Sequence, residues 1–421
     1  MKVGIYTLGC KVNIYESEYV EELLKNHGYT IVPFDEIADI YIINTCSVTN
    51  ESDRKSRKMI HQAKKRNDKA VIVVMGCYSQ THADSIDADI IIGSQDKSKI
   101  LEYLDQYFSH SEAIKKLYDV REETFFEAMN IHHFDNHTRA FVKIQDGCNA
   151  FCSYCIIPYA RGRARSKKYE DVVSEVSELV LNGYQEIVLT GIHTGRYGQD
   201  LENMNLEKLL RRLVEIPNIY RIRLSSIEVN EVTDGIVDLM KSSPVIARHL
   251  HIPLQSGSDK ILRKMNRCYD VAEFEERIKK IREIDPDISL TTDLIVGFPG
   301  ETEEDFLETL DTLKRIHFTK IHTFPYSKRE NTPASVMKDQ VDGIVKKRRV
   351  TEVLKLSNEM ERAFYEKYLG RTLPGLSECS KKGEVSILTS NYIQVSVEGN
   401  IPNNKCCLVK ITKIDEQQKV Y

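Results

Sequence analysis

The sequence has no long apolar run and no recognisable leader segment. No apolar run reaches the roughly 18 residues that a membrane-spanning helix needs. The first residues, MKVGIYTLGC, read directly as a strand and carry neither a charged-then-apolar leader nor a cleavage site. We therefore expect a cytoplasmic protein with no membrane partner.

A strong excess of charge is missing as well. The formal net charge is only −4 over 421 residues, so the global balance does not indicate nucleic-acid binding. A local basic patch could still bind RNA. There is no low-complexity tract and no repeat beyond alternating strands and helices. The length suggests two to four domains, and a hydrophobic content of 41% is enough for ordinary globular cores.

The sequence is comparatively rich in cysteine, with ten in all, and three of them are closely spaced. In a reducing compartment, metal binding or catalysis is expected rather than disulfides. DGCNAFCSYC places Cys148, Cys152 and Cys155 in the pattern C-x3-C-x2-C, and Gly147 permits a tight turn before them. Cysteine metal sites usually have four ligands. Three leave either a position open for a small molecule or a zinc site completed elsewhere, for which the upstream candidates are His132, His133 and His137.

Three more cysteines each follow a predicted strand in the N-terminal region. The strands alternate with amphipathic segments, which is typical of a parallel sheet. Because parallel strands end at one edge of the sheet, where ligand sites form, we expect these cysteines to converge. The alternative is three buried structural thiols. The runs are 3–8, 39–44 and 70–75, and the cysteines are Cys10, Cys46 and Cys77.

The remaining pattern predicts an α/β protein of several domains. Six strand-like runs in the central region are too few for a closed eight-stranded barrel and predict a partial (β/α)6 barrel, with its reaction face at the strand C-termini. Residues 101–138 read as a connector, and the C-terminal runs alternate as in a small all-β domain. The predicted parts are an N-terminal parallel α/β domain (1–138, with the connector), the barrel (139–330), a linker and helix (331–370) and the β domain (371–421).

Tyr154, two residues after Cys152, completes a motif that resembles the signature of radical S-adenosylmethionine (SAM) enzymes. The surrounding segments resemble the methylthiotransferases of that superfamily over nearly the whole chain. The branch that acts on threonylcarbamoyladenosine in tRNA is the most similar. The segments are TLGCKVNIYES, NTCSVTN, MGCYSQ, DGCNAFCSYCIIPYARGRARS, LSSIE, HIPLQSGSDKILRKMNR, DLIVGFPGETEEDF and FPYSKRENTPA.

The resemblance implies two 4Fe–4S clusters and SAM as cofactors. Cys148, Cys152 and Cys155 would hold the cluster that binds and cleaves SAM. Cys10, Cys46 and Cys77 would hold a second cluster that carries sulfur. The product would be a methylthio group on C2 of N6-threonylcarbamoyladenosine at position 37, in the anticodon loop of tRNA. A reductant such as flavodoxin or ferredoxin would supply electrons, and the sequence does not identify the sulfur donor.

The resemblance also suggests further site residues. Tyr154, Thr190 and Gly191 are candidates for SAM contacts, although TGIHTG could be an ordinary turn. Glu228 and Gln255, at the ends of the third and fourth barrel strands, could bond ribose or carboxylate, or only the barrel rim. The segment RGRARSKK (161–168) could contact phosphates or be a solvated basic loop. Its candidate RNA-binding residues are Arg161, Arg163 and Arg165.

The C-terminal β domain resembles the RNA-binding TRAM fold, although it is short. Asn331 replaces the glycine of the family's usual R-x-G-T-x-A segment, and we expect the left-handed turn to survive because asparagine tolerates it. Two alternatives stay open within the same chemistry: isopentenyl-adenosine in tRNA, or a ribosomal protein side chain. A non-catalytic iron–sulfur protein that binds RNA or transfers electrons is the alternative from another class.

Overall fold

The computed structural model describes residues 1–120, 122, 125–134, 137–381 and 383–421. Two compact units account for the chain, and each is described by itself. Unit 1 comprises Met1–Phe134, Lys143–Lys168 and Ser327–Ser335; unit 2 comprises Asp135–Val142, Tyr169–Tyr326 and Val336–Tyr421. The closely spaced cysteines therefore group with the N-terminal sheet. No helix in the described part of the chain is long and apolar enough to cross a membrane.

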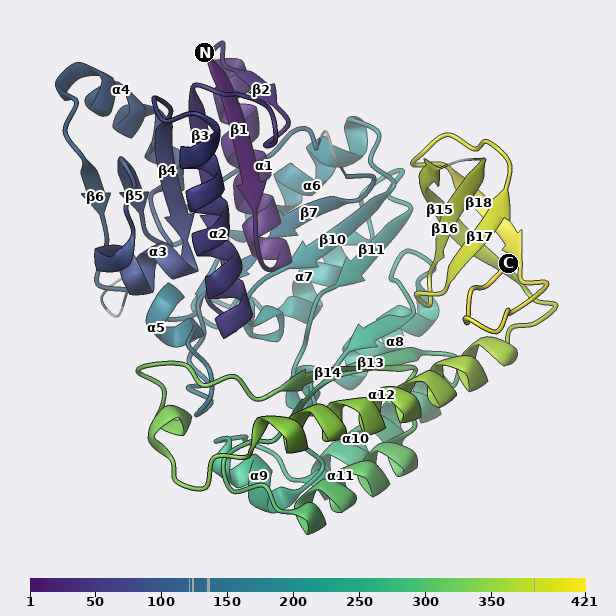
Figure 1. Ribbon diagram of the computed structural model, residues 1–421. Coiled ribbons are helices and arrows are strands. Elements are labelled where there is room, and N and C mark those ends of the chain that lie inside the picture. The colour runs from purple at the N-terminus through teal and green to yellow at the C-terminus, as the bar shows by residue number, and fades with distance from the viewer. Residues whose placement is uncertain (121, 123–124, 135–136, 382) are drawn as a thin grey trace. The chain divides into compact units, whose positions relative to one another are not determined.

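Unit 1 is built on a six-stranded sheet in the order β2-β1-β3-β4-β5-β6, and every neighbouring pair in it is parallel (Figure 1). All six residues of β3 and of β4 are buried, as expected of central parallel strands covered on both faces. The strands are β1 (Lys2–Thr7), β2 (Thr30–Val32), β3 (Ile40–Thr45), β4 (Val71–Gly76), β5 (Ile90–Ile92) and β6 (Ile114–Lys116).

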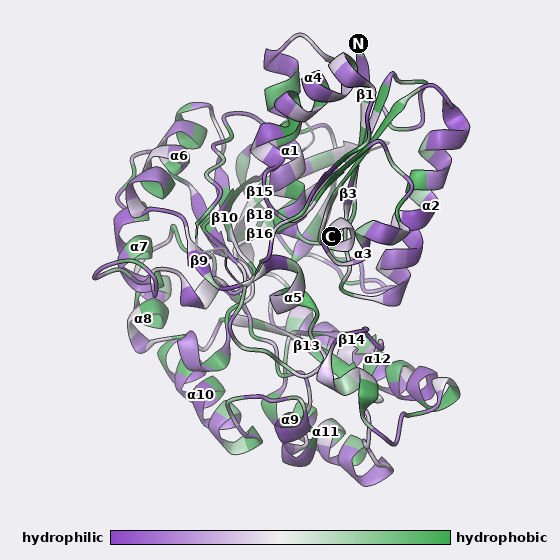
Figure 2. Cartoon of the chain, turned by 90° about the vertical axis from the view of Figure 1, so that its left-hand side faces the viewer, coloured by the Kyte–Doolittle hydropathy of each residue, from purple (hydrophilic) through white to green (hydrophobic). Residues whose placement is uncertain are grey.

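Alternate side chains of the strands pack on opposite faces of this sheet. Ile40 and Ile42 join one apolar cluster, and Tyr41 and Ile43 join another. In Figure 2 these strands appear as a largely green band, whereas the outer surface of α2 is mostly purple. The helices of unit 1 are α1 (Lys11–Asn26), α2 (Asn50–Arg66), α3 (Cys77–His82), α4 (Ile100–His110) and α5 (Ile157–Arg161), with 3-10 turns η1 (Ala83–Ser85) and η2 (Lys97–Lys99).

The connector predicted for residues 101–138 is wrong at its N-terminal end. That stretch supplies most of α4 and the edge strand β6, so it extends the sheet. Strand β6 has three residues, of which only Ile114 is buried, and such a short run gives no period-2 pattern. Two-residue strands β8 (Gln145–Asp146) and β9 (Arg165–Ser166) pair antiparallel further along the chain.

The partial barrel predicted from the sequence is present in the structure, and its strands follow one another in chain order. Two three-stranded sheets, β7-β10-β11 and β12-β13-β14, are joined by a parallel bridge between Ser226 and His251. Each strand lies inside its predicted run and ends earlier; the runs are 140–145, 186–192, 220–227, 249–256, 288–297 and 320–327. The strands are β7 (Ala140–Lys143), β10 (Glu186–Thr190), β11 (Arg221–Leu224), β12 (His249–His251), β13 (Ser289–Val296) and β14 (Lys320–Pro325).

Helices of unit 2 begin with the capping signals that their sequences carry. Thr302 and Asp305 form a reciprocal capping box at the start of α11, and Asp270 and Glu273 form another at the start of α10. The helical elements that follow β9 in the chain are α6 (Tyr169–Leu181), η3 (Thr194–Arg196), α7 (Leu206–Leu213), η4 (Val229–Glu231), α8 (Asp234–Ser242), α9 (Asp259–Lys264), α10 (Val271–Ile284), α11 (Glu303–Ile316), η5 (Pro333–Val336) and α12 (Gly343–Glu366).

The C-terminal β domain is a four-stranded antiparallel sheet in the order β17-β16-β15-β18. Phe364 of α12 and the nearby Tyr368 pack into its core, against Val385, Ile393 and Val409. The alternation in the sequence predicted β16 to β18 but not the long strand β15. The strands are β15 (Thr372–Lys381), β16 (Glu384–Thr389), β17 (Gln394–Glu398) and β18 (Cys406–Lys410).

Candidate iron–sulfur and SAM site

The first three cysteines, here called the strand-end set (Cys10, Cys46 and Cys77), follow three adjacent strands of the N-terminal sheet. Cys10 comes after β1, Cys46 after β3 and Cys77 after β4. A Cβ placed on Gly9 would lie 2.8 Å from the Cβ of Cys46 and 3.0 Å from its Sγ. The ends of β1 and β3 therefore touch beside the thiols, as the topology predicted.

Gly76 allows the chain to turn from β4 into Cys77. Its φ is +109°, which residues with a side chain rarely adopt. A Cβ there would lie 2.5 Å from the carbonyl oxygen of Thr45. Only glycine fits that close approach without moving the backbone. The close packing of the ends of β3 and β4 therefore requires a glycine directly before Cys77.

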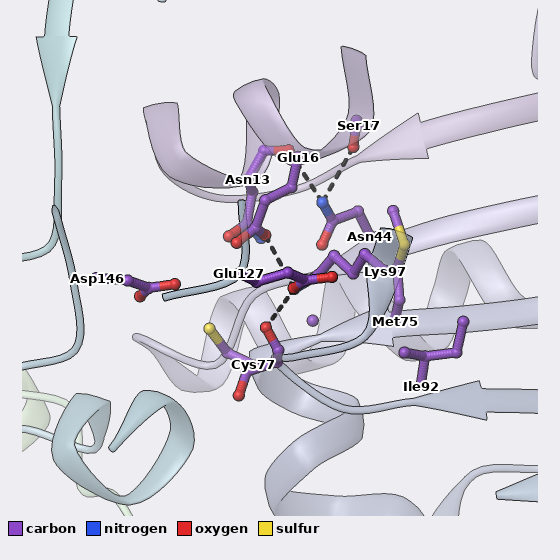
Figure 3. Close-up of polar contacts among 12 residues, drawn as sticks. Asn13, Glu16, Ser17, Asn44, Met75, Cys77, Ile92, Lys97, Glu127 and Asp146 are labelled. Carbon is purple, nitrogen blue, oxygen red and sulfur yellow. Dashed lines mark hydrogen bonds and ion pairs between the residues drawn. The ribbon is translucent and has the colours of Figure 1, made fainter. Parts of the chain in front are cut away.

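Asn13 ties the loops of the strand-end set together from the first turn of α1. Its Nδ2 donates to the carbonyl oxygens of Leu8 (2.8 Å) and Thr45 (2.9 Å), each close to a cysteine of the set. The Sγ of Cys10 lies 3.8 Å from Asn13 Oδ1, to which it donates. The Nδ2 of Asn44 in turn donates to the backbone oxygen of Asn13 (2.9 Å), as Figure 3 shows.

Burial makes the strand-end thiols reluctant to ionise as they stand. It raises the pKa of the Cys46 thiol and raises the pKa of Cys77 to about 12, with neighbouring cysteines adding to both shifts and Arg161 opposing them. Cys46 and Cys77 are 5% and 2% exposed, whereas Cys10 is exposed. Because metal ligation requires thiolates, metal binding here must displace protons.

All ten cysteines lie in the described part of the chain, and none forms a disulfide. Among the described residues, no three His, Cys, Asp or Glu side chains are arranged to hold a metal ion. An iron–sulfur cluster makes a different demand on the protein from that of a single ion, because each thiolate binds a separate iron atom. The three thiols of the strand-end set fit a cluster in their chemistry, and Cys46 and Cys77 are shielded from water.

The second set, here called the loop triad (Cys148, Cys152 and Cys155), lies on one loop of unit 1. Pairing of β8 with β9 closes the segment that contains this loop and α5. The predicted tight turn at Gly147 is present: its φ is +71°, and a Cβ there would lie 1.9 Å from the carbonyl oxygen of Arg163. Cys148 N donates to Gly162 O (3.0 Å), and Cys155 N donates to Cys152 O (2.9 Å).

The loop triad is more open to solvent than the buried members of the strand-end set. Cys148 and Cys155 are half-buried, Cys152 is buried, and Tyr154 between them is half-buried. Phe151 has a φ of +48° and is 49% exposed, and its ring lies 6.1 Å from that of Tyr159, which is 38% exposed. Of the histidines considered as a zinc ligand, His132 pairs instead with Glu22 (2.7 Å).

The basic segment after the triad is largely buried, which the sequence did not predict. Arg161 is 0% exposed and Arg165 is 1% exposed, whereas Arg163 is exposed. Arg161 pairs with Glu16 (2.8 Å) and Asp146 (3.1 Å), and Arg165 donates to the backbone oxygens of Arg161 and Arg163. The phosphate contact expected of this segment therefore stays a prediction for Arg163. For Arg161 and Arg165 it stays a prediction as well, but both side chains are buried. Carboxylates occupy Arg161, whereas Nε and Nη2 of Arg165 have no hydrogen-bond partner among the described residues.

Glu16 and Asp146 are the acidic centre of this buried network, and sequence reasoning did not find them. Burial alone would raise the pKa of Glu16, but Arg161, Lys97 and Lys143 outweigh it and lower that pKa to about 2. The same balance, led by Arg161 and Lys143, holds the pKa of Asp146 well below its usual range. Figure 3 shows Glu16, Asn13 and Lys97 gathered together, with Cys77 and Asp146 beside them. The only signal for this network in the sequence was that Glu16 lies in a segment with an amphipathic helical pattern.

The remaining candidates lie in unit 2, at the carboxyl ends of its barrel strands. Thr190 ends β10 and is buried, and Gly191 follows it half-buried. Glu228, beyond β11, caps η4 and forms an ion pair with Arg267. Gln255, beyond β12, has a φ of +66° and donates its N–H to Asp293 O (2.9 Å). Their expected contacts with SAM stay predictions.

Asn331 adopts the left-handed turn expected of it, with a φ of +65°. The neighbouring Arg329, 3% exposed, forms an ion pair with Asp53 (2.5 Å) and donates to Ser47 Oγ (3.0 Å), directly after Cys46. Ala334 N donates to Ser153 O (2.8 Å) within the loop triad. This short segment of unit 1 thus contacts the loop after Cys46 and the loop of the triad. The sequence gave no means of predicting these contacts.

Comparisons with known proteins agree with this architecture. Residues 142–313 match the radical SAM superfamily, and residues 2–93 match the uncharacterized protein family UPF0004. Among solved structures, the radical SAM methyltransferase TsrM from Kitasatospora setae covers 80% of this chain and 74% of its own, with a TM-score of 0.56 and 15% identity. At that identity the likeness shows the fold alone. The fold and the loop triad define a radical SAM protein.

Relatives with similar sequences show which family of radical SAM proteins the chain belongs to. The threonylcarbamoyladenosine tRNA methylthiotransferase MtaB of Bacillus subtilis (strain 168) is 44% identical over 94% of this chain and 90% of its own length. Its Aquifex aeolicus (strain VF5) counterpart is 40% identical over 95% and 97%. A tRNA-2-methylthio-N(6)-dimethylallyladenosine synthase of Thermoanaerobacter sp. (strain X514) is 38% identical over 92% and 84%. The chain belongs to the methylthiotransferase family of radical SAM enzymes, whose chemistry depends on SAM and a 4Fe–4S cluster.

Proposed function

We propose that this enzyme adds a methylthio group to C2 of N6-threonylcarbamoyladenosine in the anticodon loop of tRNA. The observation that carries the proposal is the pair of three-cysteine sets on the framework of unit 1. Its support comes from the 44% and 40% identity to two threonylcarbamoyladenosine tRNA methylthiotransferases, against 38% for the dimethylallyladenosine synthase. Each set is one ligand short of the four that a fully protein-bound cluster would take.

Two clusters are part of the proposal. The loop triad would hold the cluster that binds SAM, and the strand-end set would hold the second. When bound, such clusters with SAM supply one-electron chemistry that protein side chains cannot perform. The chain's own contribution is to position the thiols and keep water away. The low exposure of Cys46, Cys77 and Cys152 (5%, 2% and 8%) supports this contribution.

Five residues are candidates for SAM contacts. In unit 1, Tyr154 belongs to the loop triad itself. In unit 2, Thr190 ends β10 and Gly191 follows it, and Glu228 and Gln255 follow β11 and β12 in the same strand order. Ligands of parallel α/β proteins bind at the carboxyl ends of strands. Each of these residues is therefore proposed for binding and orienting SAM, with no role in bond cleavage.

The best-supported RNA contacts are the exposed residues on and beside the loop triad, Arg163, Phe151 and Tyr159. Arg163 offers a solvent-accessible guanidinium for phosphate, and the partly exposed rings of Phe151 and Tyr159 offer surfaces for base stacking. Aromatic rings near a cation are the usual means of binding single-stranded RNA loops. A flavodoxin-like or ferredoxin-like reductant completes the proposed partners.

The proposal is tested by mass spectrometry of tRNA nucleosides from cells with and without the gene. The expected result is loss of 2-methylthio-N6-threonylcarbamoyladenosine and accumulation of its unthiolated parent. Loss of the methylthio form of isopentenyl-adenosine instead would move the substrate to the second branch. If neither nucleoside changes, the substrate is another nucleoside or a protein, and ribosomal proteins would be analysed next.

A separate measurement distinguishes an enzyme from a carrier. Purified, anaerobically reconstituted protein should cleave SAM reductively and contain about eight irons per chain, as two 4Fe–4S clusters require. A protein with iron but without SAM cleavage would support the electron-transfer alternative. A zinc protein with neither property would exclude the radical chemistry.

A further inference from the structure

Arg161 lies at the end of α5 and contacts both cysteine loops. The sequence places it in a basic segment suited to phosphate, yet it is 0% exposed. Its guanidinium donates from all three nitrogens. The acceptors are Cys77 Sγ (3.2 Å from Nε), Glu16 Oε1 (2.8 Å from Nη1), Asp146 Oδ1 (3.1 Å from Nη1) and Asn13 Oδ1 (2.8 Å from Nη2).

Three of these four acceptors are tied to a cysteine, and Glu16 anchors the guanidinium. Cys77 is itself a member of the strand-end set. Asn13 binds the loops that lead to Cys10 and Cys46 through the carbonyl oxygens of Leu8 and Thr45. Asp146 lies two residues before Cys148, and its Oδ1 also accepts the N–H of Gly147 at 2.8 Å. One buried side chain therefore connects the three loops of the strand-end set with the start of the loop triad.

We infer that Arg161 is a positioning residue, which fixes the two cysteine sets relative to each other and raises the reduction potential of the second cluster through its bond to Cys77. This inference rests on the proposed function, because it takes Cys77 Sγ to be a cluster thiolate when the enzyme is loaded. The hydrogen bond observed is to the sulfur of the cysteine alone.

The physical reason is charge. Reduction adds a negative charge to a cluster, and a cation or N–H donor at a ligand sulfur stabilises the reduced form more than the oxidised form. Glu16 (2.8 Å) and Asp146 (3.1 Å) accept hydrogen bonds from the guanidinium and fix it in place. Lysine cannot replace arginine here, because its single ammonium does not present a planar fork to several acceptors.

The test isolates the second cluster. In the full-length chain, Cys148, Cys152 and Cys155 are changed to alanine, so that only the strand-end set can bind iron. The midpoint potential is then measured by an EPR-monitored redox titration, with and without Arg161→Lys or Arg161→Gln. The expected result is about four irons per chain and a lower potential in both Arg161 variants, the lower of the two in Arg161→Gln.

Arg349→Gln is the matched control, because Arg349 is equally buried (3% exposed) but pairs with Glu301 in unit 2. It should leave the potential unchanged. Equal potentials in wild-type and Arg161→Lys protein at full iron content would overturn the inference. So would an equal loss of iron in the Arg161 and Arg349 variants, which would reduce Arg161 to a general folding role.

A second measurement tests the bond between Arg161 and Cys77 without a variant of Arg161. Protein grown with 15N-labelled arginine and reduced at the strand-end set should show a 15N coupling in pulsed EPR, since Arg161 Nε lies next to a ligand sulfur. Absence of that coupling in a protein with about four irons would refute the Arg161 bond alone. Absence of iron from the protein in which Cys148, Cys152 and Cys155 are changed to alanine would instead refute the second cluster, and with it the proposed function.

Discussion

The two cysteine sets of unit 1 are built in different ways. The loop triad lies within eight residues, on a segment closed by the short β8–β9 pair. The strand-end set draws Cys10, Cys46 and Cys77 from three separate strands, and only the register of a parallel sheet brings them together. A local turn suffices for the first set, and the second requires the folded sheet. Damage to the loop should therefore act locally, and damage to the sheet should act globally.

The largest expected effect separates the two sets by function. Cys152→Ala should reduce SAM cleavage by more than about 100-fold, since even residues that only support a metal ligand are worth 10–100-fold. Cys77→Ala should leave SAM cleavage measurable but abolish the methylthio product. Anaerobic assays of 5′-deoxyadenosine and of modified tRNA measure both. Loss of cleavage in Cys77→Ala would show that the two sets do not act separately.

The next effect concerns stability at the strand ends. Gly76→Ala should destabilise unit 1 by about 2–4 kcal/mol, because it combines a left-handed backbone with a clash against Thr45 O. Gly28→Ala is the control: its φ of +81° is comparable, but nothing lies within 4 Å, so about 1 kcal/mol is expected. Denaturant unfolding measures both changes. Equal losses would mean that backbone conformation, and not the close approach of two strands, fixes Gly76.

A smaller effect depends on pH and on helix α1, which follows Cys10. Burial, reinforced by Glu21 and Glu22, raises the pKa of Glu18 from 4.5 to about 7. The folded chain therefore holds a proton that the unfolded chain releases, and stability falls as pH rises from 4.5 to 7. Glu18→Gln should gain about 1–3 kcal/mol relative to wild type at pH 8 and almost nothing at pH 4.

Denaturant unfolding of the wild type and Glu18→Gln across this pH range measures the gain, at the same iron content in both proteins. Glu21→Gln, in the neighbouring turn of α1, is the comparison. It removes a repulsion on Glu18 together with its own ion pair to Lys25 (2.7 Å), and should give a weaker pH dependence. A gain from Glu18→Gln that is equal at pH 4 and pH 8 would contradict ionisation of a buried carboxyl as its cause.

The smallest effect concerns the loop triad's exposed neighbour. Arg163→Ala should weaken tRNA binding several-fold and reduce the salt slope by about 1, as expected for one lost phosphate contact. Arg54→Ala is the control, since Arg54 is also exposed in unit 1 but pairs with Glu51. Fluorescence anisotropy at several salt concentrations gives both slopes. An unchanged slope for Arg163→Ala would place the phosphate contact elsewhere.

Much of the fold could be predicted from the sequence because its signals are local. Apolar runs ending at Gly9-Cys10, Thr45-Cys46 and Gly76-Cys77 fixed both the strands and the edge where they end. The six barrel runs were recognised in the same way. Strand β6, with one buried residue, and the long strand β15 were missed, because short or irregular strands lack a clear alternation.

The sequence by itself predicted which cysteines would ligate iron, in which two groups, and at which strand ends or loop they lie, because spacing and strand ends are properties of the chain. Only the tertiary structure decided the role of the basic segment after the triad. Arg161 and Arg165 have the composition of a surface patch, yet Glu16 and Asp146, one of them far away in the sequence, draw Arg161 into the interior. A buried ion pair depends on a partner brought close by folding, and no local pattern contains that information.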